Sequence, residues 1–186
     1  MTLFEYLAIA YSLVLSFTAM RIIEGLPYVV ESARRYLVHI VFVSAALLSC
    51  LADFWATWSF REAPWDFLRF IVVLANPGCL YFIACTLVPR NPDAISSWRD
   101  YMFSVRTRYF TAVGAYFLFS TINTTLMIEL PAFSPVRLVH FASMAIAIVG
   151  ARFRSERVLA AIALSYIALA AIGVFVFLRP SPLPAP

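Results

Sequence analysis

The sequence contains no lysine, and all fourteen of its basic residues are arginine. Retinal attachment and pyridoxal-phosphate chemistry both need a lysine amine for a Schiff base, so the composition excludes both. Charge of either sign is also scarce, because Asp, Glu and Arg together make up only 13% of the chain. The three cysteines, Cys50, Cys79 and Cys85, form no CxxC pair and no ligand cluster, so we expect neither a metal site nor a cofactor.

What the chain does contain is apolar sequence, which makes up 63% of its 186 residues. Soluble domains are about half apolar and about a quarter charged, so an excess of this size points to lipid as the surrounding solvent. The arginines are scattered among apolar runs rather than gathered in a basic face, so we expect no nucleic-acid partner. We therefore predict an all-α integral membrane protein, a compact bundle of six transmembrane helices.

Six stretches are near the length of about 20 apolar residues that a membrane-spanning helix needs. They are residues 3–23, 37–60, 67–88, 107–127, 136–151 and 158–178. Together they form one transmembrane domain over residues 1–178, and the Pro-rich residues 179–186 are predicted to be a disordered tail. The longest loop then runs from Pro89 to Arg106 and contains Trp98.

The arginines predict the orientation, because short cytoplasmic loops carry the positive excess. Most of them flank the loops after the first, third and fifth spans, so we expect both termini on the non-cytoplasmic side, most simply of a bacterial inner membrane. Six of them are predicted to contact anionic lipid headgroups. They are Arg34, Arg35, Arg106, Arg108, Arg152 and Arg154. At the opposite boundary, Trp55, Trp58 and Trp65 are typical of an interfacial aromatic belt.

A weak internal repeat links the two halves of the chain. Ile23-Glu24-Gly25-Leu26-Pro27 near the first span matches Ile128-Glu129-Leu130-Pro131 after the fourth, and Leu-Val-His ends at His39 and again at His140. Three spans per half would place the halves in opposite orientations, a 3+3 inverted repeat of the kind that transporters use. Coincidence in a low-diversity apolar sequence is the alternative.

Polar or small residues recur at helical spacing in four spans, and we expect these stripes to face the interior. The second span carries the clearest stripe, which is His39, Ala46, Cys50, Asp53 and Thr57. The first span offers Glu5, Ala8, Ser12 and Ser16. The fourth offers Thr111, Gly114, Thr121 and Thr125, and the fifth offers His140, Ser143, Ala147 and Gly150.

Asp53 is the leading candidate for a functional group, because an unpaired carboxylate at this depth costs several kcal/mol or takes up a proton. Arg69 enters from the same side on the third span. One interpretation is a fixed ion pair between them that locks the hairpin; the other is a protonatable or cation-attracting site in a polar path. Other candidates for that path are Asn76, Glu5, His39 and His140.

Two further features bear on this path. Asn76-Pro77-Gly78 interrupts the third span, and Pro77 predicts a kink or a short unwound turn. His39 lies about 21 Å along its helix from Asp53, and His140 falls near the opposite face, so neither a His–Asp dyad nor a bis-histidine ligand pair is expected.

A small channel or transporter for an ion or small solute is the function that these features favour most. The alternative is a non-catalytic subunit or assembly partner of a larger membrane complex. A lipid-acting enzyme is a weaker third, and we predict no enzyme, because the sequence offers no nucleophile–base pair. The expected partners are membrane lipids and either further copies of the chain or another membrane protein.

Overall fold

The fold was examined in a computed structural model, which describes residues 3–31 and 33–177, and their side chains as far as residue 171. Six α-helices and two short 3₁₀ turns make up these ranges, which contain no strand. The helices are α1 (Leu3–Val30), α2 (Leu37–Thr57), α3 (Phe67–Leu87), α4 (Trp98–Ile128), α5 (Pro135–Arg152) and α6 (Glu156–Phe177), with η1 (Trp58–Phe60) and η2 (Pro92–Ala94) between them. This confirms the all-α class, whereas the predicted tail 179–186 lies outside the described residues.

Five of the six helices, α1 to α5, are long and apolar enough to cross a membrane when η1 is counted with α2. Their sides are rich in exposed apolar side chains, among them Ile9, Leu51 and Ile148. Such surfaces are unfavourable in water and suit contact with lipid. The structure therefore has the helices of a multi-span membrane protein, which is consistent with an integral membrane location, and α6 as a further membrane span stays a prediction.

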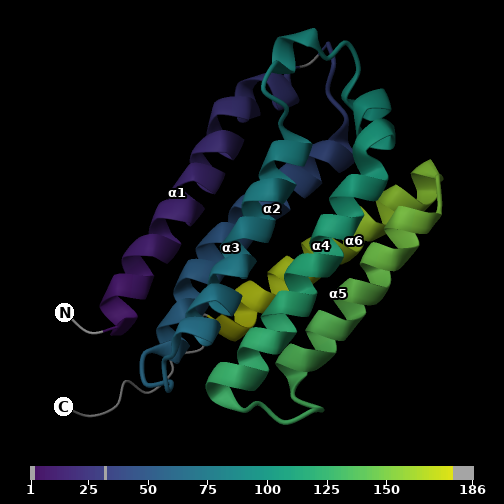
Figure 1. Cartoon of the computed structure of the whole chain (residues 1–186). Helices are drawn as coiled ribbons and strands as arrows, with labels where there is room; N and C mark the ends of the chain where they lie inside the picture. Colours follow the sequence, from purple (N-terminus) through teal and green to yellow (C-terminus); the bar gives the residue numbers. More distant parts are fainter. Residues whose placement is uncertain (1–2, 32, 178–186) are drawn as a thin grey trace.

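The helices alternate in direction, so their ends gather at two opposite ends of the molecule (Figure 1). We call the end where α1 stops and α2 begins the arginine end, and the end where α2 stops and α3 begins the tryptophan end. α1 begins and α6 stops at the tryptophan end. Trp55 and Trp58 are exposed there, with 72% and 63% of their surface accessible.

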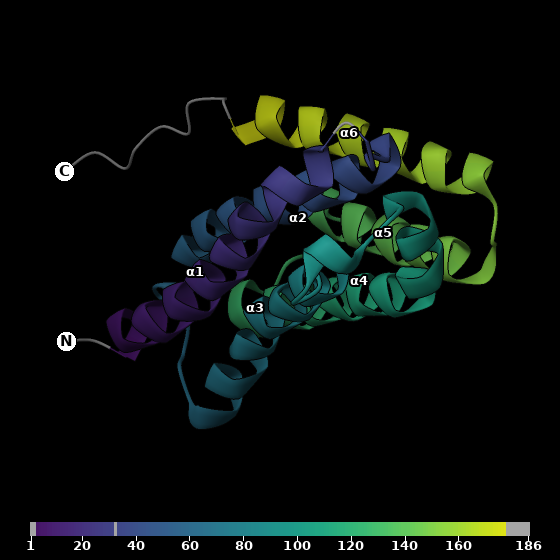
Figure 2. The ribbon, with the colours of Figure 1, turned by 90° about the horizontal axis from the view of Figure 1, so that it is seen from above.

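α1 packs on α2 and α3, and α4 packs on α3 and α5. α6 contacts α2 and α5 and lies along one side of the molecule, as the view in Figure 2 shows. A cluster of aromatic rings fills the space between these elements, where Phe42 of α2 meets Tyr109 and Phe110 of α4 and Tyr166 of α6. The interior near the arginine end is therefore aromatic and apolar.

Two predicted helix ends are wrong. α1 continues to Val30 instead of stopping at 23, and it includes Pro27. α4 begins at Trp98 instead of 107, because the Ser97 hydroxyl accepts a hydrogen bond from the amide of Asp100 and caps the helix there. Trp98 is therefore the first residue of a helix and is fully buried, rather than part of a long loop.

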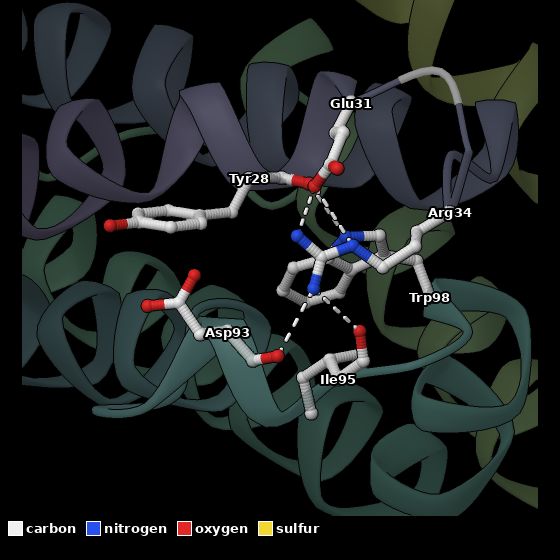
Figure 3. Close-up of polar contacts among 6 residues, drawn as sticks. All are labelled: Tyr28, Glu31, Arg34, Asp93, Ile95 and Trp98. Carbon is white, nitrogen blue, oxygen red and sulfur yellow. Dashed lines mark hydrogen bonds and ion pairs between the residues drawn. The ribbon is translucent and has the colours of Figure 1, made fainter.

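At the arginine end, hydrogen bonds connect the end of α1, the two loops and the start of α4 (Figure 3). We call this set of contacts the arginine-end clasp; its residues are Tyr28, Glu31, Arg34, Asp93, Ile95 and Trp98. The Arg34 guanidinium pairs with the Glu31 carboxylate and donates to the carbonyls of Asp93 and Ile95, at 3.2 and 2.9 Å. The Trp98 indole N–H donates to the Tyr28 carbonyl at 2.8 Å. Arg34 was predicted to contact lipid headgroups, but the structure assigns its donors to protein acceptors.

The two segments of the proposed repeat adopt different conformations. Ile23 to Pro27 lie within α1, whereas Glu129 has a left-handed backbone with φ 47° and ends α4. A left-handed residue cannot continue a right-handed helix, so the second segment terminates α4. The first segment continues α1 without a break. This pair of segments therefore does not match in structure, whereas both Leu-Val-His segments lie near the start of a helix, in α2 and α5, and the inverted repeat is not confirmed.

Candidate functional site

The predicted polar stripe of α2 is buried over its whole length. His39, Ala46, Cys50, Asp53 and Thr57 each expose at most 8% of their surface. The prediction that this face points inward is confirmed. Asp53 is the only buried acidic residue in the part of the chain that the structure describes.

The Asp53 carboxylate accepts hydrogen bonds from three other helices. Tyr11 of α1 donates its hydroxyl to Oδ2 at 2.5 Å. Oδ1 accepts from the Asn76 amide of α3 at 3.0 Å and from the Tyr116 hydroxyl of α4 at 3.1 Å. All three donors are neutral, so the charge of an ionised Asp53 is spread over hydrogen bonds and has no cation beside it.

The network continues from Asn76 to Ser120 of α4. The Asn76 amide donates to the Ser120 hydroxyl at 3.1 Å, and that hydroxyl lies 2.9 Å from the carbonyl of Tyr116. Thr57 donates to the backbone carbonyl of Asp53 at 2.8 Å. Four helices thus meet at one carboxylate through a continuous set of hydrogen bonds.

The depth of this network follows from helix geometry. Tyr11, Asn76 and Ser120 lie eight or nine residues from the tryptophan end of their helices, which is about 12–14 Å at 1.5 Å per residue. The hydrocarbon core of a bilayer is about 30 Å thick. A carboxylate held by these residues therefore lies inside the hydrocarbon core, on the half nearer the tryptophan end, where an unpaired charge is costly.

The structure separates Arg69 from Asp53, so the predicted ion pair is wrong. Arg69 is in the first turn of α3, and its guanidinium pairs with Asp66 at 3.3 Å and donates to the Pro64 carbonyl at 2.5 Å. Asp66 is the N-cap of the same helix and lies closer than Asp53 does. Arg69 therefore helps to fix the start of α3 and takes no part in the Asp53 network.

Glu5 does not face the interior as predicted. It is exposed on α1, whose buried face is formed by Leu7, Tyr11, Leu15 and Thr18. Because that face is about a third of a turn away, the stripe of Ser12 and Ser16 is half-buried to exposed. The prediction for α1 identified the wrong face of the right helix.

The two histidines lie apart from this network. His39 is fully buried at the arginine end, where its ring stacks on Trp98 with 4.8 Å between centroids. His140 is half-buried on α5, and its Nδ1 lies 3.3 Å from the Thr121 hydroxyl. Of the residues proposed for a polar path, Asp53 and Asn76 are brought together by a hydrogen bond.

α3 runs as one α-helix through Asn76, Pro77 and Gly78, so the unwound turn considered there is not formed. A kink at Pro77 stays a prediction. Asn76 is 3% exposed, and its side-chain amide donates to Asp53 and Ser120. These hydrogen bonds, and not an unwound turn of the helix, account for its burial.

Sequence reasoning missed Tyr11, Tyr116 and Ser120. The two tyrosines were counted as apolar, yet a buried phenol needs a partner for its hydroxyl. Each lies within a membrane-length helix, away from the interfaces where lipid-facing tyrosines are enriched. That position was the available signal for an internal acceptor such as Asp53.

No model of a known protein family matches the chain, and no curated protein or solved structure is significantly similar to it. The chemistry must therefore be argued from the site itself. An ionised Asp53 can accept all three donors, whereas a protonated Asp53 adds a donor of its own and must lose or rearrange one of these bonds. A proton on either oxygen of Asp53 thus changes the hydrogen bonding between α2 and the helices bound to that oxygen, which are α1 at Oδ2 or α3 and α4 at Oδ1.

Replacing Tyr11 with Phe is expected to lower the free energy of unfolding by about 1–2 kcal/mol, because it removes a buried hydrogen bond to a carboxylate. The measurement is a double-mutant cycle with Asp53→Asn, using unfolding of the purified protein in mild detergent. The coupling energy between the two sites should be of the same size. Tyr6→Phe, on the exposed side of the same helix, is the control and should change little. Additive effects of Tyr11→Phe and Asp53→Asn would contradict the hydrogen bond.

Proposed function

We propose that the protein is a small membrane channel or transporter for an ion or small solute, and that Asp53 takes up and releases a proton during its cycle. The observation that carries this proposal is the buried Asp53 carboxylate, which in the part of the chain that the structure describes is bound only by the neutral donors Tyr11, Asn76 and Tyr116. Ionisable groups at membrane depth are costly and mark ion or proton pathways more often than they serve packing alone.

The coupling would come from the geometry of the carboxylate. Each oxygen of Asp53 holds at least one donor, and these donors belong to α1, α3 and α4. Adding a proton turns one acceptor into a donor, so the hydrogen bond at that oxygen must break or reverse its direction, as the Tyr11 hydroxyl at Oδ2 can do by accepting. A shift between two packings of these helices is then driven by the proton.

This proposal includes a six-helix membrane bundle with α6 as the sixth span. It places the arginine end in the cytoplasm of a bacterial cell and both termini on the other side. The arginine end has more arginines than the tryptophan end. This supports that orientation, since cytoplasmic loops carry the excess of positive charge. Asp53 is then closer along α2 to the non-cytoplasmic boundary, because it is four residues from the end of that helix.

The test is flux in liposomes that contain the purified protein. With a pH gradient across the bilayer and a trapped pH-sensitive dye, the wild-type protein should dissipate the gradient faster than empty liposomes do. Asp53→Asn should reduce this rate to that of empty liposomes, because asparagine cannot exchange a proton in this range. Parallel measurements with potassium, sodium and chloride gradients identify a coupled ion.

Asp100→Asn is the matched control, since it makes the same chemical change in the exposed first turn of α4. It should retain wild-type flux. If the wild-type protein carries neither protons nor these ions, or if Asp53→Asn carries them at the wild-type rate, the proposal is wrong. Circular dichroism of each variant confirms that it is folded.

A second candidate function, a subunit or assembly partner of a larger membrane complex, is favoured by one surface of α6. Ala161, Ala168 and Ala171 are exposed on this helix, and small residues allow close contact between membrane helices. Mass measurement of the intact protein after purification in mild detergent separates the two candidates. A second polypeptide in constant ratio supports the subunit function, and a species made only of this chain weakens it.

A further inference from the structure

A second site lies at the arginine end, between α1, α3 and α4. It is a pocket of about 460 Å³ whose lining includes three arginines from three separate segments: Arg21 of α1, Arg90 after α3 and Arg108 of α4. Tyr81 and Tyr101 line it as well. No acidic residue is part of the lining. The volume is within the range of small-molecule sites.

Among the described residues, no carboxylate forms an ion pair with these three guanidinium groups. Within residues 3–31 and 33–177, the ion pairs involve Arg34, Arg61, Arg69 and Arg99, and none of the pocket arginines. Arg21 donates its Nε–H to the backbone carbonyl of Val88 at 3.1 Å, which orients the group and leaves its terminal nitrogens for another acceptor. Three like charges around one cavity repel each other unless an anion lies between them.

The depth of the pocket identifies the kind of anion. From Leu3 to Arg21 is 18 residues, or about 27 Å of helix, and from Arg108 to Ile128 is 20 residues, or about 30 Å. These lengths match the hydrocarbon thickness of a bilayer, so the arginines lie at headgroup level when the tryptophan end is at the other boundary. Tyr81, 44% exposed, and the neighbouring Phe82, 49% exposed, lie on the membrane-facing side.

We propose that this pocket binds a phosphate group, supplied by the headgroup of an anionic phospholipid. Arginine donates paired hydrogen bonds to phosphate oxygens, and Tyr101 is held in place because its hydroxyl donates to the Thr86 carbonyl at 2.8 Å. The acyl chains would pass over Phe82 into the bilayer. Basic pockets between membrane helices on the cytoplasmic side are suited to such headgroups. This site is independent of Asp53, which no pocket residue contacts by a hydrogen bond within the described residues.

The test uses the purified full chain in detergent with three additions at equal concentration. They are dioctanoyl phosphatidylglycerol, dioctanoyl phosphatidylcholine and inorganic phosphate. Phosphatidylglycerol should raise the melting temperature in a saturable way, and phosphatidylcholine should raise it less, because its choline charge opposes the arginines. The double variant Arg90→Gln/Arg108→Gln should bind phosphatidylglycerol about tenfold more weakly or worse.

Arg99→Gln/Arg157→Gln is the matched control, because it removes the same charge from two exposed arginines at the same end that neither line the pocket nor were predicted to contact headgroups. It should retain wild-type binding. An equal loss in both double variants would show a general charge effect and overturn the pocket. An equal response to inorganic phosphate would assign the site to a free phosphate compound instead of a lipid. If Arg90→Gln/Arg108→Gln melts early without additions, Arg108→Gln alone is used, and an unchanged lipid affinity overturns the proposal.

Discussion

Replacing Trp98 with alanine is expected to lower the free energy of unfolding by about 3–5 kcal/mol. Trp98 is completely buried and is the largest of the fully buried side chains within the described residues. Its ring stacks on His39 and meets Tyr101 edge-on at 5.6 Å between centroids. Alanine would leave a cavity among these rings.

The indole N–H adds a second contribution. The last four carbonyls of a helix have no partner within it, and Trp98 donates to one of these in α1, the carbonyl of Tyr28. Trp98→Phe keeps an aromatic ring but loses this hydrogen bond. It should therefore lower the free energy of unfolding by about 1–2 kcal/mol. The two variants therefore separate packing from hydrogen bonding at one position.

Denaturation of the purified protein in detergent, followed by far-ultraviolet circular dichroism, measures both effects. Trp55→Ala is the control, because it removes the same side chain from a position that is 72% exposed at the tryptophan end. It should change stability much less than Trp98→Ala. Equal losses in the two alanine variants would contradict the role of Trp98 as the centre of the arginine-end clasp.

Donors from a neighbouring element satisfy the ends of other helices as well. Tyr101 donates to the Thr86 carbonyl near the end of α3, and Arg106 donates to the Ala151 carbonyl near the end of α5 at 3.2 Å. Arg137 donates two bonds to Leu130 just after α4. The last carbonyls of a helix have no donor partner within it, so these contacts stabilise the helix ends. Arg106 was predicted to contact lipid headgroups; this bond uses only its Nη2, and the headgroup contact stays a prediction.

The inward face of α2 was predictable from sequence, and the face of α1 was not. In α2 the buried polar group is a carboxylate, which cannot be satisfied by its own helix and must face donors elsewhere. In α1 the polar candidates were serines, and these bond to their own backbone: Ser12 to the Ile9 carbonyl and Ser16 to the Ser12 carbonyl. A hydroxyl satisfied in this way needs no place in the interior.

The same reason applies to α4. Thr121 and Thr125 donate to carbonyls four residues earlier, and Thr125 is exposed. Ser120 and Asn123 are the buried polar residues of that part of the helix. On α5, by contrast, Ser143, Ala147 and Gly150 are buried as predicted, because small residues permit close approach to α4. The buried face of a helix can be predicted from sequence where small or charged residues determine it. It cannot be predicted from Ser or Thr, whose hydroxyls can bond to a carbonyl of their own helix.

Gly150→Ala is expected to destabilise the protein by about 1–3 kcal/mol, because the new methyl group has no room. A β-carbon at Gly150 would lie 2.5–2.6 Å from the ring of Phe110 in α4, closer than any van der Waals contact. Phe110 is 1% exposed and is held by the rings of Phe42 and Tyr109, so it has little freedom to move aside. The strain must therefore separate α4 from α5.

Gly78→Ala provides the matched control, because a β-carbon there meets no atom within 4 Å. Alanine is a better helix former than glycine by up to about 1 kcal/mol, so this variant should be neutral or stabilising in the same detergent denaturation. Gly150→Ala combined with Phe110→Leu should cost less than the sum of the two single changes, since a smaller side chain makes room for the methyl group. Opposite signs for Gly150→Ala and Gly78→Ala would locate the tight contact between α4 and α5, and the same sign would contradict it.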